Sequence, residues 1–207
     1  MTRVIAPGQG EIVGDSPTRR VEILSDDPAV NVTVSRFGPG QEGADLHVHH
    51  RHSDFFYVLE GELTVRLGPQ DEQRTVPAGS LARVPPGVVH GFRNASGADL
   101  RYLNLHAPGC EFTTYMRGLR DGVRFVYDQH DPPADGGRPI SEAEVTGGDG
   151  VLADTDAVRI EREHVGVLRG PAAGFVLEGE AAGTWLEVPA GEEYRVDAPL
   201  LRVTGSA

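Results

Sequence analysis

The sequence predicts an all-β protein built around a small antiparallel barrel. Glycine (27 residues) and proline (15 residues) are plentiful, whereas aromatic residues make up only 6% of the 207 positions. This composition favours many short strands joined by tight turns over a bundle of helices. Short segments of strand-like sequence recur along the chain, bounded by glycine, proline or asparagine. Such regular spacing is typical of a barrel or a sandwich.

The strands of this barrel are predicted from alternation and β-propensity. Residues 19–37 alternate between apolar and polar positions around a turn at residues 26–28, which indicates two strands. Residues 54–67 are β-branched and aromatic, and Gly61 interrupts them where a hairpin or a bulge fits. Further short strands are predicted over residues 73–76, 80–84, 90–94 and 100–105.

The chain is predicted to have three parts. Residues 1–127 form the barrel, with a short helix near 111–119 that caps it. Residues 128–150 are rich in aspartate, glycine and proline and are interpreted as a linker. Strand-like character returns in residues 151–207, which we expect to form a β-rich C-terminal extension.

Two sequence echoes link the extension to the barrel. Residues 175–180 (FVLEGE) resemble 57–62 (YVLEGE), and residues 188–191 repeat the VPAG of 76–79. Echoes in the same order indicate a degenerate internal repeat, with chance recurrence of turn sequences as the alternative. The extension would then be a degenerate second half that has lost the histidines of the first.

Charge and cysteine content exclude several classes of function. The formal net charge is −12, and no cluster of lysine and arginine offsets it, so neither nucleic-acid nor membrane binding is expected. The single Cys110 cannot form an internal disulfide, and no apolar stretch resembles a signal peptide or a membrane span. We predict a cytoplasmic protein, and exposed strand edges favour a homodimer, which size-exclusion chromatography with light scattering would reveal.

Histidines in two segments could converge on one metal ion. His47 and His49 are two residues apart at the end of a predicted strand, so both imidazoles lie on one face. A short turn would bring the carboxylate of Asp54 beside them, and His90 follows a turn shaped by Pro85 and Gly87. Three imidazoles and a carboxylate suit one divalent ion of Fe, Mn, Co, Ni, Cu or Zn.

Both segments resemble the conserved motifs of the cupin superfamily. The first motif is matched by His47, His49, Asp54 and Gly61, and the second at every fixed position by Gly79, Pro85, Gly87, His90 and Asn94. The resemblance covers roughly residues 30–108 and implies a cupin jelly-roll β-barrel whose interior metal is bound by the three histidines and the acidic residue. The sequence departs from the first motif at two positions. Gly40 lies one residue too early to be its leading glycine, and Asp54 replaces a glutamate.

The exchange of glutamate for Asp54 bears on the chemistry. Aspartate is one methylene shorter, so its carboxylate reaches roughly 1.5 Å less far. Asp54 could therefore bind the metal directly, bind it through water, or act as a free catalytic base. Phe56 and Phe92 fall on the inward face as walls of a substrate pocket, with core packing as the alternative reading. The remaining histidines are interpreted as loop or structural residues: His50, His52, His106, His130 and His164.

The resemblance implies a metal-dependent enzyme that acts on a small molecule. The sequence is loosely similar to the flavonol and quercetin 2,4-dioxygenase cupins. This similarity favours a dioxygenase that acts on a chelating flavonol- or enediol-like substrate, with O₂ as the second substrate. The alternatives are a metal-dependent isomerase, epimerase or lyase of a sugar or small acid, and a non-catalytic small-ligand-binding cupin. The fold and the metal set define the site but not the reaction.

Overall fold

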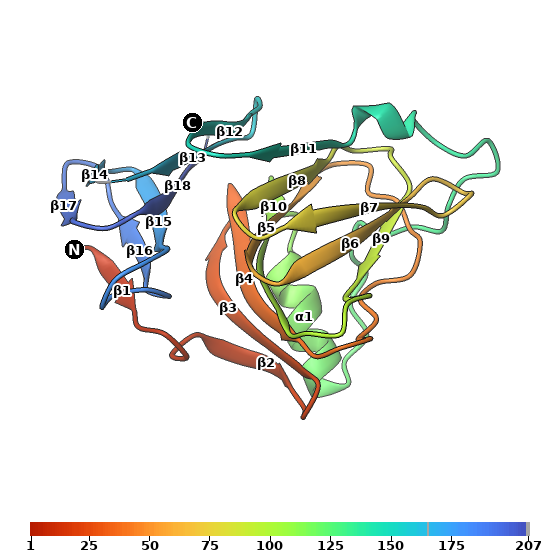
Figure 1. Cartoon of the computed structure of the whole chain (residues 1–207), viewed down its shortest axis with the longest axis horizontal. Helices are drawn as coiled ribbons and strands as arrows, with labels where there is room; N and C mark the ends of the chain where they lie inside the picture. The colour runs from red at the N-terminus through yellow and green to blue at the C-terminus, as the bar shows by residue number, and fades with distance from the viewer. Residues whose placement is uncertain (165, 206–207) are drawn as a thin grey trace. The chain divides into compact units, whose positions relative to one another are not determined.

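The computed structural model describes residues 1–164 and 166–205, and its regular structure is almost entirely β-strand (Figure 1). The all-β prediction is confirmed. Contacts divide the chain into two compact units. We call Ile12–Thr146 the barrel unit, and Met1–Glu11 with Gly147–Ala207 the terminal unit. No helix in the described ranges is long and apolar enough to span a bilayer.

The barrel unit contains a seven-stranded sheet and a three-stranded sheet. The larger sheet has the order β11-β8-β5-β10-β4-β3-β2 and the smaller one β7-β6-β9 (Figure 1). The strands of the larger sheet are β2 (Glu11–Asp15), β3 (Arg19–Asp27), β4 (Val30–Phe37), β5 (Ser53–Glu60), β8 (Ser80–Val84), β10 (Leu100–Ala107) and β11 (Glu144–Gly147). Those of the smaller sheet are β6 (Glu62–Leu67), β7 (Glu72–Pro77) and β9 (His90–Arg93). Neighbours far apart in sequence, such as β5 and β10, give the jelly-roll topology.

One apolar core lies between these two sheets. Alternate side chains of β4, β5 and β10 meet those of β6, β7 and β9, because successive strand residues point to opposite faces. Its fully buried members include Phe37, Phe56, Leu63, Val76 and Leu100. Phe37 also stacks edge-on against Tyr102, with 5.3 Å between ring centroids. This packing holds β5 and β9, which carry Asp54 and His90, in fixed positions.

Gly61 forms the predicted turn between β5 and β6. Its φ is +73°, a conformation that costs other residues energy. A Cβ there would lie only 2.4 Å from the carbonyl oxygen of Asp99.

We expect Gly61→Ala to lower the free energy of unfolding by about 3 kcal/mol, because backbone strain and overlap add. Gly40→Ala is the matched control, since Gly40 has a φ of +69° but open space around it. That variant should lose only about 1 kcal/mol. Urea denaturation measures both, and equal losses would contradict the role of the Asp99 contact.

Helix α1 (Phe112–Asp121) follows β10 and agrees with the short helix predicted from the sequence. Its residues Phe112 and Met116 pack with Val21 and Ile23 of β3 and with Tyr127. Gly122 ends the helix in the left-handed conformation, and its N–H bonds back to the carbonyl of Gly118. The helix is thereby fixed against the barrel.

Residues 128–146, expected to begin a linker, belong to the barrel unit. The backbone of His130 exchanges two hydrogen bonds with Val48, and Gly137 forms a bridge with Val88. A 3₁₀ turn (Ile140–Glu142) then leads into β11, which extends the larger sheet beside β8. The segment is rich in turn residues because it follows the barrel surface, not because it is a linker without contacts to the barrel.

The terminal unit contains a six-stranded sheet of order β1-β16-β15-β18-β13-β12 and a two-stranded sheet β14-β17. Its strands are β1 (Arg3–Ile5), β12 (Gly150–Asp154), β13 (Val158–Glu163), β14 (Gly166–Arg169), β15 (Ala172–Val176), β16 (Trp185–Val188), β17 (Glu193–Val196) and β18 (Leu200–Gly205). The N-terminal residues belong here because β1 pairs with β16. Three residues of the expected extension, Val165 and residues 206–207, lie outside the described ranges.

The sequence echoes coincide with similar turns in the two units. Gly61 and Gly179 have φ values of +73° and +81°, and Gly79 and Gly191 have +80° and +82°. In the barrel unit the two echoes are separated by the hairpin β6-β7, whereas β16 alone separates them in the terminal unit. This geometry agrees with a degenerate repeat whose second copy is one strand shorter.

Candidate metal centre

The fold brings His47 and His90 side by side although they are far apart in the sequence. Their backbones exchange two hydrogen bonds, each 2.8 Å long, in an isolated β-bridge. His49 lies two residues further along the same segment, and Asp54 is the second residue of β5. All four side chains are buried, with 1–5% of each residue exposed. The residues predicted from the sequence therefore meet inside the barrel unit.

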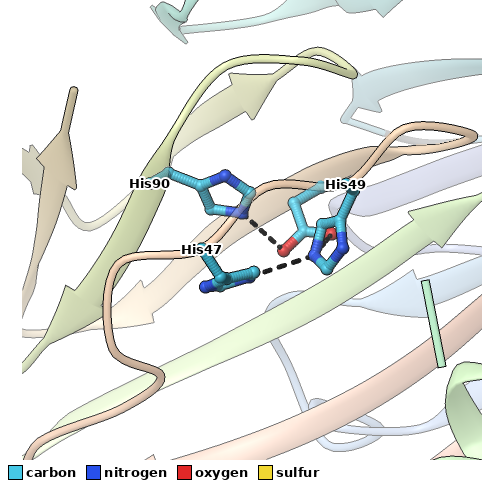
Figure 2. A group of neighbouring side chains, drawn as sticks. His47, His49 and His90 are labelled. Atoms are coloured by element: carbon cyan, nitrogen blue, oxygen red, sulfur yellow. Dashed lines mark hydrogen bonds and ion pairs between the residues drawn. The ribbon is translucent and has the colours of Figure 1, made fainter. Parts of the chain in front are cut away.

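The three imidazoles point toward one another (Figure 2). The Nε2 atoms of His47 and His49 are 3.1 Å apart, and Nε2 of His90 lies 3.3 Å from Oδ2 of Asp54. One ligand atom from each of the four residues lies within 4.8 Å of the other three. Separations of roughly 3 Å are those of ligands about 2.0–2.2 Å from a common ion.

Backbone carbonyls fix the tautomer of each imidazole. Nδ1 of His47 lies 2.6 Å from the carbonyl oxygen of Asp45, and Nδ1 of His90 lies 3.0 Å from that of Val88. Nδ1 of His49 likewise faces the carbonyl of Asp128. A carbonyl oxygen can only accept, so each Nδ1 carries the hydrogen and each Nε2 presents a lone pair.

Three inward lone pairs with no hydrogen between them suit a cation. Metal-bound histidines are oriented in the same way, by a hydrogen bond from the second ring nitrogen. The donor chemistry of His47, His49, His90 and Asp54 therefore fits a divalent transition-metal ion, with mixed nitrogen and oxygen ligands.

The electrostatics of the pocket agree with this fit. Burial lowers the pKa of His47 to about 3, so its imidazole is neutral at physiological pH. Burial alone would raise the pKa of Asp54, but the neighbouring His106 and His49 hold that pKa well below its usual value. The pocket then contains the neutral imidazole of His47 beside the ionised carboxylate of Asp54, and a divalent cation would compensate the buried negative charge.

The metal-free protein should lose stability as the pH falls from about 6.5 to about 5. Burial lowers the pKa of His47 to about 3 and that of His106 to about 4, from 6.5. In this interval the unfolded chain binds protons that the folded chain does not, so the free energy of unfolding decreases as the pH decreases. Each of the two histidines contributes a loss of about 2 kcal/mol at pH 5.

Urea denaturation of metal-free protein across this pH range measures the loss. The His47→Gln variant is the control, because it lacks one of the two titrating groups and should show about half the slope. A free energy of unfolding that stayed constant between pH 6.5 and pH 5 would contradict the burial of these imidazoles as neutral groups.

A second group of polar side chains adjoins Asp54 and was not predicted as part of the site. His106 lies opposite Asp54 in the register of β10 and β5, and its Nδ1 is 2.9 Å from Oδ1 of Asp54. His52, interpreted from the sequence as a loop residue, is buried with its Nε2 2.8 Å from the hydroxyl of Tyr127. Asp128 accepts hydrogen bonds from the backbone N–H groups of His50 and Arg51. The sequence offered only one indication that His106 lies near the site, namely the expected pairing of the strands that precede and follow the two motifs.

The other histidines lie away from the four converging ligands. His130 contacts the carboxylate of Asp128 at 3.1 Å and its ring lies 4.7 Å from that of His50. His164 is exposed and pairs with Asp149 at 2.9 Å in the terminal unit.

A cavity of about 260 Å³ opens beside the predicted metal ligands. His47, His49 and Asp54 form one part of its wall. Aromatic and thioether side chains form much of the rest, namely Phe92, Tyr102, Phe112, Tyr115, Met116 and Tyr127. Phe92 lines this cavity and also belongs to the core, whereas Phe56 packs behind it in the core, with 5.0 Å between the ring centroids. The volume is slightly below the ~300–1,000 Å³ of typical ligand pockets, which indicates a small ligand.

Comparison with known proteins finds a family model that matches the segment around this site. Residues 33–106 match the family model described as a cupin domain, and this range contains all four converging ligands. In this range the chain is similar to a cupin domain. It is also 30% identical over 120 residues to quercetin 2,3-dioxygenase of Bacillus subtilis (strain 168). That alignment covers 57% of this chain but 34% of the dioxygenase, so this chain matches about a third of its relative.

Solved structures share the fold of this chain. The protein Ylba from Escherichia coli superposes with a TM-score of 0.66 at 13% identity, over 99% of this chain and 90% of its own. The bacterial pirin YhhW from Escherichia coli, in complex with nickel(II), gives a TM-score of 0.64 at 13% identity, over 100% and 99%. At such low identities the likeness concerns the fold alone.

Proposed function

We propose that the protein is a metal-dependent dioxygenase that acts on a small chelating substrate of the flavonol or enediol type. The observation that carries the proposal is the set of three inward lone pairs and one carboxylate that opens on a cavity with aromatic walls. The 30% identity to a quercetin 2,3-dioxygenase supports the same class of reaction. His47, His49 and His90 would hold the ion, with Asp54 as fourth ligand or base.

The chain would contribute binding, orientation and a proton acceptor. A bound divalent ion would supply Lewis acidity and a common point of attachment for substrate and O₂. Asp54 is ionised because its pKa is well below the usual value, so one of its oxygens can accept the proton of a phenol or enol. The second oxygen of the same carboxylate remains available to the ion.

Aromatic side chains would select a flat substrate and exclude water. Phe112 and Tyr115 of α1 line the cavity together with Phe92 of β9. Their ring faces favour offset or edge-on contact with an aromatic or conjugated ligand. A dry cavity strengthens the interaction of the carboxylate and the ion with the substrate. The cavity of about 260 Å³ limits the substrate to a small molecule.

Oxygen uptake tests the proposal directly. Protein loaded separately with Fe²⁺, Mn²⁺, Co²⁺, Ni²⁺, Cu²⁺ or Zn²⁺ is mixed with quercetin and with smaller enediols, in air and under argon. We expect at least one metal form to consume O₂ in proportion to substrate, and no form to turn over under argon. The His90→Ala variant serves as the control for metal-independent oxidation.

Two outcomes would reject the dioxygenase. Substrate conversion that continues under argon would indicate a metal-dependent isomerase, epimerase or lyase of a sugar or small acid, in which Asp54 moves a proton without O₂. Tight ligand binding without conversion in either atmosphere would indicate a non-catalytic binding cupin.

A further inference from the structure

A second set of inward-facing donor atoms lies on the other side of Asp54. Nδ1 of His106 is 3.1 Å from Nε2 of His52 and 2.9 Å from Oδ1 of Asp54. The hydroxyl of Tyr127 lies 2.8 Å from each of these two ring nitrogens. All four side chains are buried, with at most 6% of any residue exposed. We call this group the inner cluster.

The tautomers of its two histidines follow from their outer partners. Nδ1 of His52 lies 3.1 Å from the carboxylate of Asp128, which can only accept when ionised. Nε2 of His106 lies 3.1 Å from Oδ1 of Asn104, and the amide nitrogen of Asn104 donates to the carbonyl of Phe55 at 3.3 Å. Both outer nitrogens therefore carry hydrogens, and both inner nitrogens present lone pairs.

The inner cluster has more acceptors than donors. His52 Nε2, His106 Nδ1 and Asp54 Oδ1 can each accept, and the Tyr127 hydroxyl has one hydrogen to donate. Oδ1 of Asp54 accepts no hydrogen bond of good geometry from the described residues, although it is buried. Buried acceptors that face one another at about 3 Å need a proton or a metal cation between them.

The carboxylate of Asp54 is shared between the two sets of donors. Its Oδ2 lies 3.3 Å from Nε2 of His90, among the predicted metal ligands. Its Oδ1 faces the inner cluster, 2.9 Å from His106 and 3.5 Å from His52. A single carboxylate with one oxygen directed to each side has the arrangement of a bridging ligand between two cations.

We propose that the inner cluster is a second metal position, at which His52, His106 and Asp54 bind a divalent transition-metal ion and Tyr127 lies beside it. Two imidazoles and a carboxylate oxygen are donors for Zn²⁺, Co²⁺, Ni²⁺ or Fe²⁺. The four residues His49, His52, Asp54 and His106 have ligand atoms within 4.8 Å of one another, as the first set does, and His49 and Asp54 belong to both groups. Nε2 of His49 is 3.6 Å from Oδ1 of Asp54. With both positions filled, Asp54 would be a ligand to two ions and not a free base, which leaves only its ligand role under the proposed function.

Metal counting with Co²⁺ tests the proposal on the intact chain. Co²⁺ is added to metal-free protein, the visible absorption is followed to saturation, and bound metal is measured by elemental analysis after dialysis. We expect about two equivalents in the wild type and about one in His106→Gln and in His52→Gln. The His90→Gln variant should also hold about one, and the His90→Gln/His106→Gln double variant should hold none.

Glutamine retains much of the size and polarity of histidine, and thermal melting verifies that each variant folds. If one single variant failed to fold, the other two would still separate the positions. The proposal would be overturned if the wild type bound one equivalent of Co²⁺ and His106→Gln had the same metal content and affinity. The inner cluster would then contain a proton instead of a metal ion. Loss of all metal from His106→Gln would also overturn the proposal, because it would show that both sets of donors bind one and the same ion. Neither result depends on the dioxygenase assay.

Discussion

The His90→Ala variant is expected to lose the ion of the first position and to consume O₂ about 10³-fold more slowly than the wild type. Without His90 only two imidazoles, those of His47 and His49, remain to bind the ion. Loss of the ion would remove the several kcal/mol by which it stabilises the transition state. The barrel should remain folded, because its two sheets close on an apolar core that excludes His90. We expect the metal-free variant to lose only about 1–3 kcal/mol of unfolding free energy.

Elemental analysis, O₂ uptake and urea denaturation of the same preparation measure the three effects of this substitution. His164→Ala is the matched control, because the His164 side chain is 70% exposed and pairs with Asp149 in the terminal unit. That variant should equal the wild type in all three. A His90→Ala variant with unchanged Co²⁺ affinity and O₂ uptake would show that the chemistry occurs elsewhere.

The Asp54→Asn variant is expected to lower the rate of O₂ uptake by about 10²–10⁴-fold, the usual contribution of a positioned acid or base. Asparagine has the shape of aspartate but cannot accept a proton as a carboxylate does. It also removes the negative charge that holds cations in the buried pocket, so metal affinity should fall as well.

The Asp54→Glu variant separates these two losses, because it keeps the charge and restores the residue usual in the cupin motif. We expect it to bind metal and to retain measurable O₂ uptake, at a cost in stability of about 1–3 kcal/mol for the extra buried methylene. Steady-state O₂ consumption with metal content measured in parallel distinguishes the two variants. Asp54→Asn with the wild-type rate would exclude Asp54 as the base.

The four converging ligands were predictable because they lie in two local motifs with fixed spacing. His47 and His49 share one strand face, and the turn at Pro85 and Gly87 places His90 at the start of β9. The short helix was also predicted, since its sequence pattern is local. What the motifs could not indicate was the environment of the other oxygen of Asp54.

The inner cluster depends on tertiary pairing. His106 reaches Asp54 only because β10 pairs with β5 in one particular register. Tyr127 and Asp128 reach His52 because the chain after α1 returns over the barrel, and composition alone makes this segment resemble a linker. The strand β1 was likewise unpredictable, because its partner β16 lies more than 180 positions away. Single-sequence patterns contain no information on such long-range pairs.

Diffraction from crystals of cobalt-loaded protein, recorded at the metal absorption edge, tests the central claim most directly. An anomalous peak about 2.0–2.3 Å from the Nε2 atoms of His47, His49 and His90 is predicted. The absence of a peak at this place in metal-loaded crystals would contradict the account. So would a ring of His47, His49 or His90 whose Nε2, instead of Nδ1, faces the backbone carbonyl.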